Sequence, residues 1–225
     1  MNLDDAVIEE TKRVIIYGDP FTGKTTLAAK LAEKFKLHWL DIEHGASSII
    51  RNVPKEFHKN IDLIQIPDTK ANPIAAETCL KIFDGGKCVI CVEHGKVNCP
   101  LCAKVTEAKF NTICLRELTR EDVFVLDSST QLANSIMSHI CRNKPTDYKP
   151  EWEDYAVQGR LLDKIFSQMQ GGNYNCVIIS HAQMVGTEKS DKIVTEKYVE
   201  NHLKIGVESL KQLINDGHTV KHLRF

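Results

Sequence analysis

Short apolar runs alternate along this chain with longer stretches in which apolar residues recur every three or four positions. The short runs predict buried strands, and they lie at residues 13–18, 37–43, 61–67, 122–127 and 175–183. Because strands separated by helices build β-α units, this alternation predicts an α/β fold with a mostly parallel sheet flanked by helices.

The apolar residues between the runs predict helices that pack on the sheet. Their stripes are Leu27, Leu31 and Phe35; Ala76, Cys79, Leu80 and Phe83; Leu132, Ile136 and Ile140; Trp152, Tyr155, Leu162, Phe166 and Met169; and Leu203, Val207, Leu210 and Ile214. We expect Trp152 to lie in the core because it starts such a stripe. The stretch 86–104 has neither period and reads as an insert, and residues 1–225 are otherwise expected to form a single domain.

Composition excludes little. The chain has 29 Lys plus Arg and 30 Asp plus Glu, and this balance by itself does not indicate a nucleic-acid partner. No apolar run approaches the roughly 20 residues of a membrane span, and the acidic N-terminal stretch is unlike a secretory signal. We therefore expect a cytoplasmic protein, in the host cytoplasm if the chain is viral, with no membrane contact and with reduced cysteines.

The stretch YGDPFTGKTTLAAKL (17–31) fits the phosphate-loop pattern G-x-x-x-x-G-K-[ST] and follows a predicted strand. Its glycines let backbone N–H groups surround a phosphate, Lys24 would reach the β- and γ-phosphates, and Thr25 would bind Mg²⁺. ATP is the default nucleotide. The expected nucleotide-binding residues are Gly18, Asp19, Pro20, Phe21, Thr22, Gly23, Lys24, Thr25 and Thr26.

Two acids at strand ends are candidates for the hydrolytic chemistry. Asp127 ends the run VFVLD and is expected to hold Mg²⁺; alternatively it caps the next helix, although Ser128 or Ser129 can do that. Glu43 follows the run WLDIE, where a carboxylate could deprotonate a water for attack on the γ-phosphate. The alternative for Glu43 is a cap or a solvated acid.

The stretches WLDIEHG, IQIPDT, VFVLDSST and VIISHAQ occur in the order found in RecA-like ATPases. Across residues 12–186 the chain resembles, among these, phage nucleotide-binding proteins of the Sak-type single-strand-annealing group. The resemblance implies a RecA-like ATPase domain in which Glu43 is the catalytic base and His181 or Gln183 senses the γ-phosphate, and Lys24 of the phosphate loop is expected to assist the hydrolysis. We give supporting roles to Asp41 and His44.

The same resemblance implies that the ATPase acts on single-stranded DNA in recombination, annealing or replication. It also implies a homo-oligomeric ring or filament and a partner protein from recombination or replication. Lys189, Lys192 and Lys197 could contact DNA phosphates or a neighbour's ATP site, or could belong to a solvated hairpin. Tyr148, next to Lys149, could stack on a base.

The insert carries two C-x-x-C pairs, Cys88 with Cys91 and Cys99 with Cys102. Four thiolates at this spacing can surround Zn²⁺ tetrahedrally and leave no position for water, so the sequence predicts a structural zinc site. His94 is a possible substitute ligand that four cysteines make unnecessary. Unligated thiols or a redox pair are the alternatives.

Two other functions are compatible with the phosphate loop. A small-molecule kinase would usually have an Arg-rich lid, whereas the candidate arginines of this chain are scattered at Arg116, Arg120, Arg142 and Arg160. A nucleotide-dependent adaptor would dock a protein partner through the zinc insert.

Overall fold

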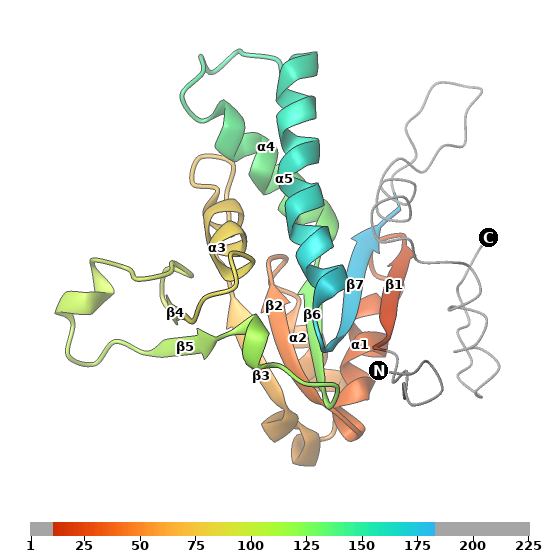
Figure 1. Ribbon diagram of the computed structural model, residues 1–225. Coiled ribbons are helices and arrows are strands. Elements are labelled where there is room, and N and C mark those ends of the chain that lie inside the picture. Colours follow the sequence, from red (N-terminus) through yellow and green to blue (C-terminus); the bar gives the residue numbers. More distant parts are fainter. Residues whose placement is uncertain (1–10, 183–225) are drawn as a thin grey trace, which may run out of the picture.

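The computed structural model describes residues 11–182 of the chain (Figure 1). Several sequence predictions lie outside these residues: Gln183, the lysines at 189, 192 and 197, and the stripe from Leu203 to Ile214. The fold and the site are therefore described from the remaining 172 positions, 11 to 182 inclusive.

A five-stranded, wholly parallel sheet forms the centre of the molecule, in the order β1-β7-β6-β2-β3. Its strands are β1 (Arg13–Gly18), β2 (Lys36–Asp41), β3 (Ile61–Gln65), β6 (Asp122–Asp127) and β7 (Asn175–His181). All five coincide with the apolar runs in the sequence, and the prediction of a mostly parallel α/β sheet is confirmed. Such runs predict the strands well because both faces of a parallel sheet are buried.

Helices cover both faces of this sheet (Figure 1). They are α1 (Lys24–Ala29), α2 (Ala46–Asn52), α3 (Ile74–Ile82), α4 (Ser129–Cys141) and α5 (Trp152–Gly171), with 3₁₀-helices η2 (Lys30–Glu33), η3 (Lys55–Asn60), η4 (Cys102–Lys104) and η5 (Leu115–Glu117). Alternation along β6 shows the two layers. Phe124 and Leu126 pack with α3, α4 and α5, whereas Val123 and Val125 pack with α1 and α2.

The first helix differs in part from its predicted stripe. It ends at Ala29 and continues as 3₁₀-helix, and Leu27 is exposed. The residues that face the sheet are instead Ala28, Ala29 and Ala32, all at most 1% exposed. Small side chains let the backbone of this segment approach the sheet closely, and the predicted residues Leu31 and Phe35 pack partly buried against the same core.

The prediction that Trp152 is a core residue is wrong. Its side chain is 84% exposed, because α5 begins at this residue at the far end of the α4–α5 hairpin, beyond the sheet (Figure 1). Tyr155, in the same first turn, is also exposed, whereas the later part of the stripe is confirmed, since Leu162, Phe166 and Met169 are buried where α5 reaches the sheet.

The predicted insert contains a small antiparallel sheet of β4 (Cys88–Cys91) and β5 (Phe110–Ile113), so this unit reaches beyond residue 104. It stands at the side of the molecule where β3 forms the sheet edge (Figure 1). The Asn111 side-chain amide donates a hydrogen bond to the backbone oxygen of Leu63 in β3, at 3.2 Å. The insert thus contacts the open edge of the main sheet.

None of the helices in the described part of the chain combines the length and the apolarity that crossing a membrane requires.

Candidate nucleotide and metal sites

The phosphate loop connects β1 to α1, as the sequence predicts. Gly23 adopts φ 88°, a left-handed conformation that glycine reaches without strain, at the turn into α1. The Lys24 ammonium donates hydrogen bonds to the carbonyl oxygens of Gly18, at 2.9 Å, and Asp19, at 2.8 Å. Burial lowers the pKa of Lys24, although the nearby carboxylates of Glu43, Asp127 and Asp19 oppose this shift. The lysine is therefore folded back over the loop, with acids around it.

Thr25 and Asp127, the two predicted magnesium ligands, are in contact. The Thr25 hydroxyl donates to Asp127 Oδ2 at 3.0 Å, and the other carboxylate oxygen, Oδ1, is buried without a hydrogen-bond partner. A buried carboxylate oxygen without a partner is unfavourable, and a hard cation or its bound water would satisfy it. A Cβ on Gly45 would lie 3.6 Å from Asp127 Oδ2, so glycine leaves space beside this acid. These residues fit Mg²⁺.

The raised pKa of Asp127 predicts that the affinity for magnesium depends on pH. Burial raises its pKa to about 7; the Thr25 hydrogen bond acts against this, and the charges of Glu43 and Asp41 add to it. In the metal-free protein, ionisation of this buried acid disfavours folding as the pH rises from the ordinary carboxyl pKa towards 7. Mg²⁺ binds the ionised form, so below pH 7 we expect Mg-nucleotide affinity to fall by about tenfold per pH unit.

Titration calorimetry across pH 7 checks this prediction, with Asp127→Asn as the control that cannot ionise and that reports the nucleotide's own titration. Equal pH slopes in the two proteins would contradict it.

Glu43 lies at the carboxyl end of β2, two residues beyond the strand, and both of its carboxylate oxygens have partners. Oε1 accepts a short hydrogen bond from the Ser128 hydroxyl, and Oε2 lies 2.9 Å from His181 Nε2. The carboxylate is only a quarter exposed. Ser128 also caps α4, since its hydroxyl accepts from the Gln131 N–H at 3.2 Å. Helix capping therefore falls to Ser128 and does not require Asp127, and no local sequence pattern indicates the contact between Ser128 and Glu43.

Asp41 shapes the loop that carries Glu43. It is fully buried at the end of β2, and its carboxylate accepts hydrogen bonds from the backbone N–H groups of Gly45 and Ala46 at 3.0 and 3.1 Å. Gln65 of β3 donates a third, at 3.2 Å. Asp41 thus has the supporting role expected for it, because these bonds close the turn in which Glu43 lies. His44, also in that turn, has φ 58° and an exposed side chain.

Strand order brings the site together. His181 in β7 pairs with Gly18 in β1, and Asp127 in β6 pairs with Asp41 in β2. Parallel strands end at the same edge of a sheet, so the phosphate loop, His181, Asp127 and Glu43 all meet at the carboxyl edge. The His181 backbone N–H donates to Thr130 Oγ1 at 2.9 Å, which fixes the end of β7 against α4.

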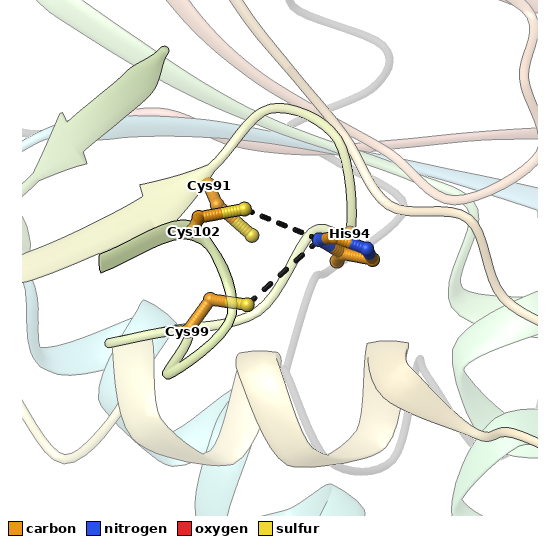
Figure 2. A group of neighbouring side chains, drawn as sticks. All are labelled: Cys91, His94, Cys99 and Cys102. Carbon is orange, nitrogen blue, oxygen red and sulfur yellow. Dashed lines mark hydrogen bonds between the residues drawn. The ribbon is translucent and has the colours of Figure 1, made fainter. Parts of the chain in front are cut away.

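The insert gathers a second group of side chains, here named the Cys/His cluster: Cys91, His94, Cys99 and Cys102. Its four ligand atoms all lie within 4.8 Å of one another (Figure 2). His94 Nδ1 lies 3.2 Å from the Cys102 sulfur and 3.8 Å from the Cys99 sulfur. This arrangement is a possible metal site.

The predicted ligand Cys88 is outside the Cys/His cluster, and His94 takes its place. Cys88 and Cys91 are three residues apart in the β4 strand, so their side chains point to opposite faces. Cys91 points into the cluster, whereas Cys88 packs in the main core and its thiol donates to the Lys81 carbonyl oxygen at 3.5 Å. The spacing of the cysteines indicated a metal site, but the pleat of β4 excludes one of them.

A parallel sheet with helices on both faces, a phosphate loop after β1, and a Thr–Asp pair that fits Mg²⁺ define a P-loop ATPase domain. The chain matches the family model of an AAA domain over residues 10–223, and it belongs to that family.

A search of curated protein sequences found no match. Among solved structures, the chain is similar to a prototypical ATPase from the type III secretion system of pathogenic bacteria, with a TM-score of 0.48 and 12% sequence identity. The similarity covers 93% of this chain and 54% of that protein, so the chain spans about half the length of the protein it matches.

Proposed function

We propose that this protein is a RecA-like ATPase that hydrolyses ATP to control its binding or annealing of single-stranded DNA, in the manner of the phage single-strand-annealing proteins it resembles. The observation that supports ATP hydrolysis is the position of Glu43, which lies beside the phosphate loop and beside the Thr25–Asp127 pair. ATP and Mg²⁺ are its cofactors, and Zn²⁺ enters only as a structural cofactor of the insert.

Glu43 is the general base in this proposal. A water bound between Glu43 and the γ-phosphate attacks phosphorus in line, the water's proton passes to the carboxylate, and ADP leaves with the bond between the β- and γ-phosphates broken. Lys24 stabilises the charge on the phosphates, which requires its ammonium to leave the Gly18 and Asp19 carbonyls. Mg²⁺, held by Thr25 and Asp127, neutralises phosphate charge when bound.

His181 is the candidate sensor because it contacts Glu43 at the end of β7, which pairs with the start of the phosphate loop. Its Nε2 lies 2.9 Å from Glu43 Oε2. A bound γ-phosphate would offer His181 a hydrogen-bond acceptor that competes with Glu43. If His181 moved to the phosphate, one carboxylate oxygen of Glu43 would become free to contact water. The position of the strand end would then report whether ATP or ADP is bound.

The α4–α5 hairpin is the part of the described chain that we assign to single strands. Trp152 is 84% and Tyr155 53% exposed, on the first turn of α5, and exposed aromatic faces are the surfaces on which unpaired bases stack. Tyr148, the aromatic residue singled out from the sequence, has another partner: its hydroxyl donates to Asp154 at 2.5 Å, and the Lys144 ammonium lies 4.9 Å from its ring centre. Trp152 is therefore the better stacking candidate.

A ring or filament of identical chains is part of the same proposal. Phe21, at the tip of the phosphate loop, is fully exposed, and a neighbouring subunit completing the ATP site would cover this apolar side chain. The proposal also includes a protein partner from recombination or replication. It places the protein in the cytoplasm, in that of the host if the protein is viral.

The test is steady-state ATP hydrolysis with and without single-stranded DNA, in the wild type and in Trp152→Ala. We expect single strands to raise the rate, and we expect the variant to bind a fluorescent oligonucleotide about 5- to 150-fold more weakly, because base stacking on an aromatic residue contributes about 1–3 kcal/mol. Its hydrolysis without DNA should match that of the wild type.

The matched control is Phe110→Ala, which removes an exposed aromatic residue from the insert and should leave DNA binding unchanged. If single-stranded DNA did not change the rate of hydrolysis and no oligonucleotide were bound, the proposed action on single-stranded DNA would be wrong. Phosphorylation of a small molecule would favour the kinase, and nucleotide retention without turnover would favour the adaptor.

A further inference from the structure

We propose that the Cys/His cluster binds one structural Zn²⁺ through three thiolates and His94 Nδ1, and that this ion fastens the insert over the open edge of the sheet at β3. The donor set fits. Zinc–sulfur bonds of about 2.3 Å and zinc–nitrogen bonds of about 2.0–2.1 Å place tetrahedral donors about 3.5–3.8 Å apart. His94 Nδ1 already lies 3.2 and 3.8 Å from two of the sulfurs (Figure 2).

Burial points to the same conclusion. Cys91, Cys99 and Cys102 are at most 2% exposed, yet they form a hydrophobic cluster of their own, joined only by the partly buried Ala108. The larger apolar side chains around them face solvent: Val92, Leu101, Val105 and Phe110. Three thiols bury too little apolar surface to hold such a loop together, and a structural metal is the usual means of folding a segment of this size.

The backbone of the insert is shaped for coordination. The Gly95 N–H donates to the Cys91 carbonyl at 2.9 Å and the Ala103 N–H to the Cys99 carbonyl at 3.0 Å, so each C-x-x-[CH] pair closes a tight turn. These turns bring Cys91 and His94 together, and likewise Cys99 and Cys102. With four protein ligands the site has no open position, and its role is structural rather than catalytic.

The turn from Cys91 to Gly95 packs tightly against the ATPase core. Gly95 has φ 62°, and a Cβ on it would come within 2.8 Å of Pro67 and 3.0 Å of the Ile66 backbone, directly after β3. Its carbonyl accepts a hydrogen bond from the Thr78 hydroxyl of α3 at 2.7 Å. Because His94 is the residue before Gly95, a metal that holds His94 also holds this contact. An exposed sheet edge promotes aggregation, and the Asn111–Leu63 hydrogen bond places the insert against the edge at β3.

The test measures metal bound to the purified full-length chain after dialysis against metal-free buffer, by elemental analysis. We expect one zinc per chain in the wild type, and near zero in Cys99→Ser and in His94→Ala. The control is Cys88→Ala, which removes the cysteine that packs in the main core and should retain one zinc. ATP binding by each variant shows that the ATPase domain is folded.

Substitution with Co²⁺ checks the ligand set, since the thiolate-to-cobalt absorption of wild type and Cys88→Ala should correspond to the same three thiolates. Removal of zinc by a chelator should lower the melting temperature and promote aggregation, and both effects should reverse on adding Zn²⁺. Zinc lost from Cys88→Ala but kept in His94→Ala would overturn the assignment in favour of the four-cysteine set. Iron in place of zinc, or no stoichiometric metal in the wild type, would overturn the site itself.

Discussion

Replacing Glu43 by Gln is expected to lower kcat for ATP hydrolysis by about 10²–10⁴-fold, the usual contribution of a general base. The amide has the same shape and can still accept the hydrogen bond from Ser128, but it cannot take a proton from water. ATP binding should persist, because the proposed role of Glu43 is to activate the water rather than to hold the nucleotide. Single-turnover hydrolysis and calorimetric ATP binding, measured on the same preparation, separate the two effects.

Glu33→Gln is the matched control, since it makes the same chemical change at an exposed position in η2 and should leave kcat unchanged. Ser128→Ala is a second variant to measure in the same experiment. It removes the hydrogen bond that positions Glu43 and should lower kcat by a smaller factor without changing ATP affinity. A Glu43→Gln protein that hydrolyses ATP at the wild-type rate would show that another group activates the water.

Replacing Lys24 by Ala is expected to weaken ATP binding by about 10- to 150-fold, because a hydrogen bond to a charged group contributes about 1.5–3 kcal/mol. Hydrolysis should fall further, since in the proposed mechanism the lysine also stabilises charge on the γ-phosphate. The fold should survive. The Gly18 carbonyl still accepts from the Ala182 N–H at 3.1 Å, and Asp19 is exposed to water.

Calorimetry with ATP and thermal melting of the nucleotide-free protein check both parts of this prediction. Lys30→Ala removes an exposed lysine six residues further along and serves as the control, with unchanged affinity. If Lys24→Ala bound ATP as tightly as the wild type, the ammonium would have to remain on the Gly18 and Asp19 carbonyls in the nucleotide complex, and its assigned role would be wrong.

The sequence by itself determined the sheet strands and the phosphate loop, because both depend on local pattern. A buried parallel strand needs a short apolar run whatever its neighbours are, and the loop from Gly18 to Thr25 is encoded in eight consecutive residues. Asp127 could be proposed from its position at the end of an apolar strand, but Asp41 ends β2 in the same way and closes a turn instead, so local pattern alone does not separate the two roles. The Thr25–Asp127 hydrogen bond agrees with that assignment.

Tertiary structure decided the features that depend on direction and on strand order. The contacts of Glu43 with Ser128 and His181 arise only because β2, β6 and β7 are neighbours in the sheet, which no local pattern encodes. Trp152 has a helical period like that of a core residue, yet it lies where α5 extends past the sheet. Cys88 has the spacing of a metal ligand, but a strand sends side chains three residues apart to opposite faces, and His94 occupies its place because a turn, unlike a strand, can bring its side chain back to the sulfurs.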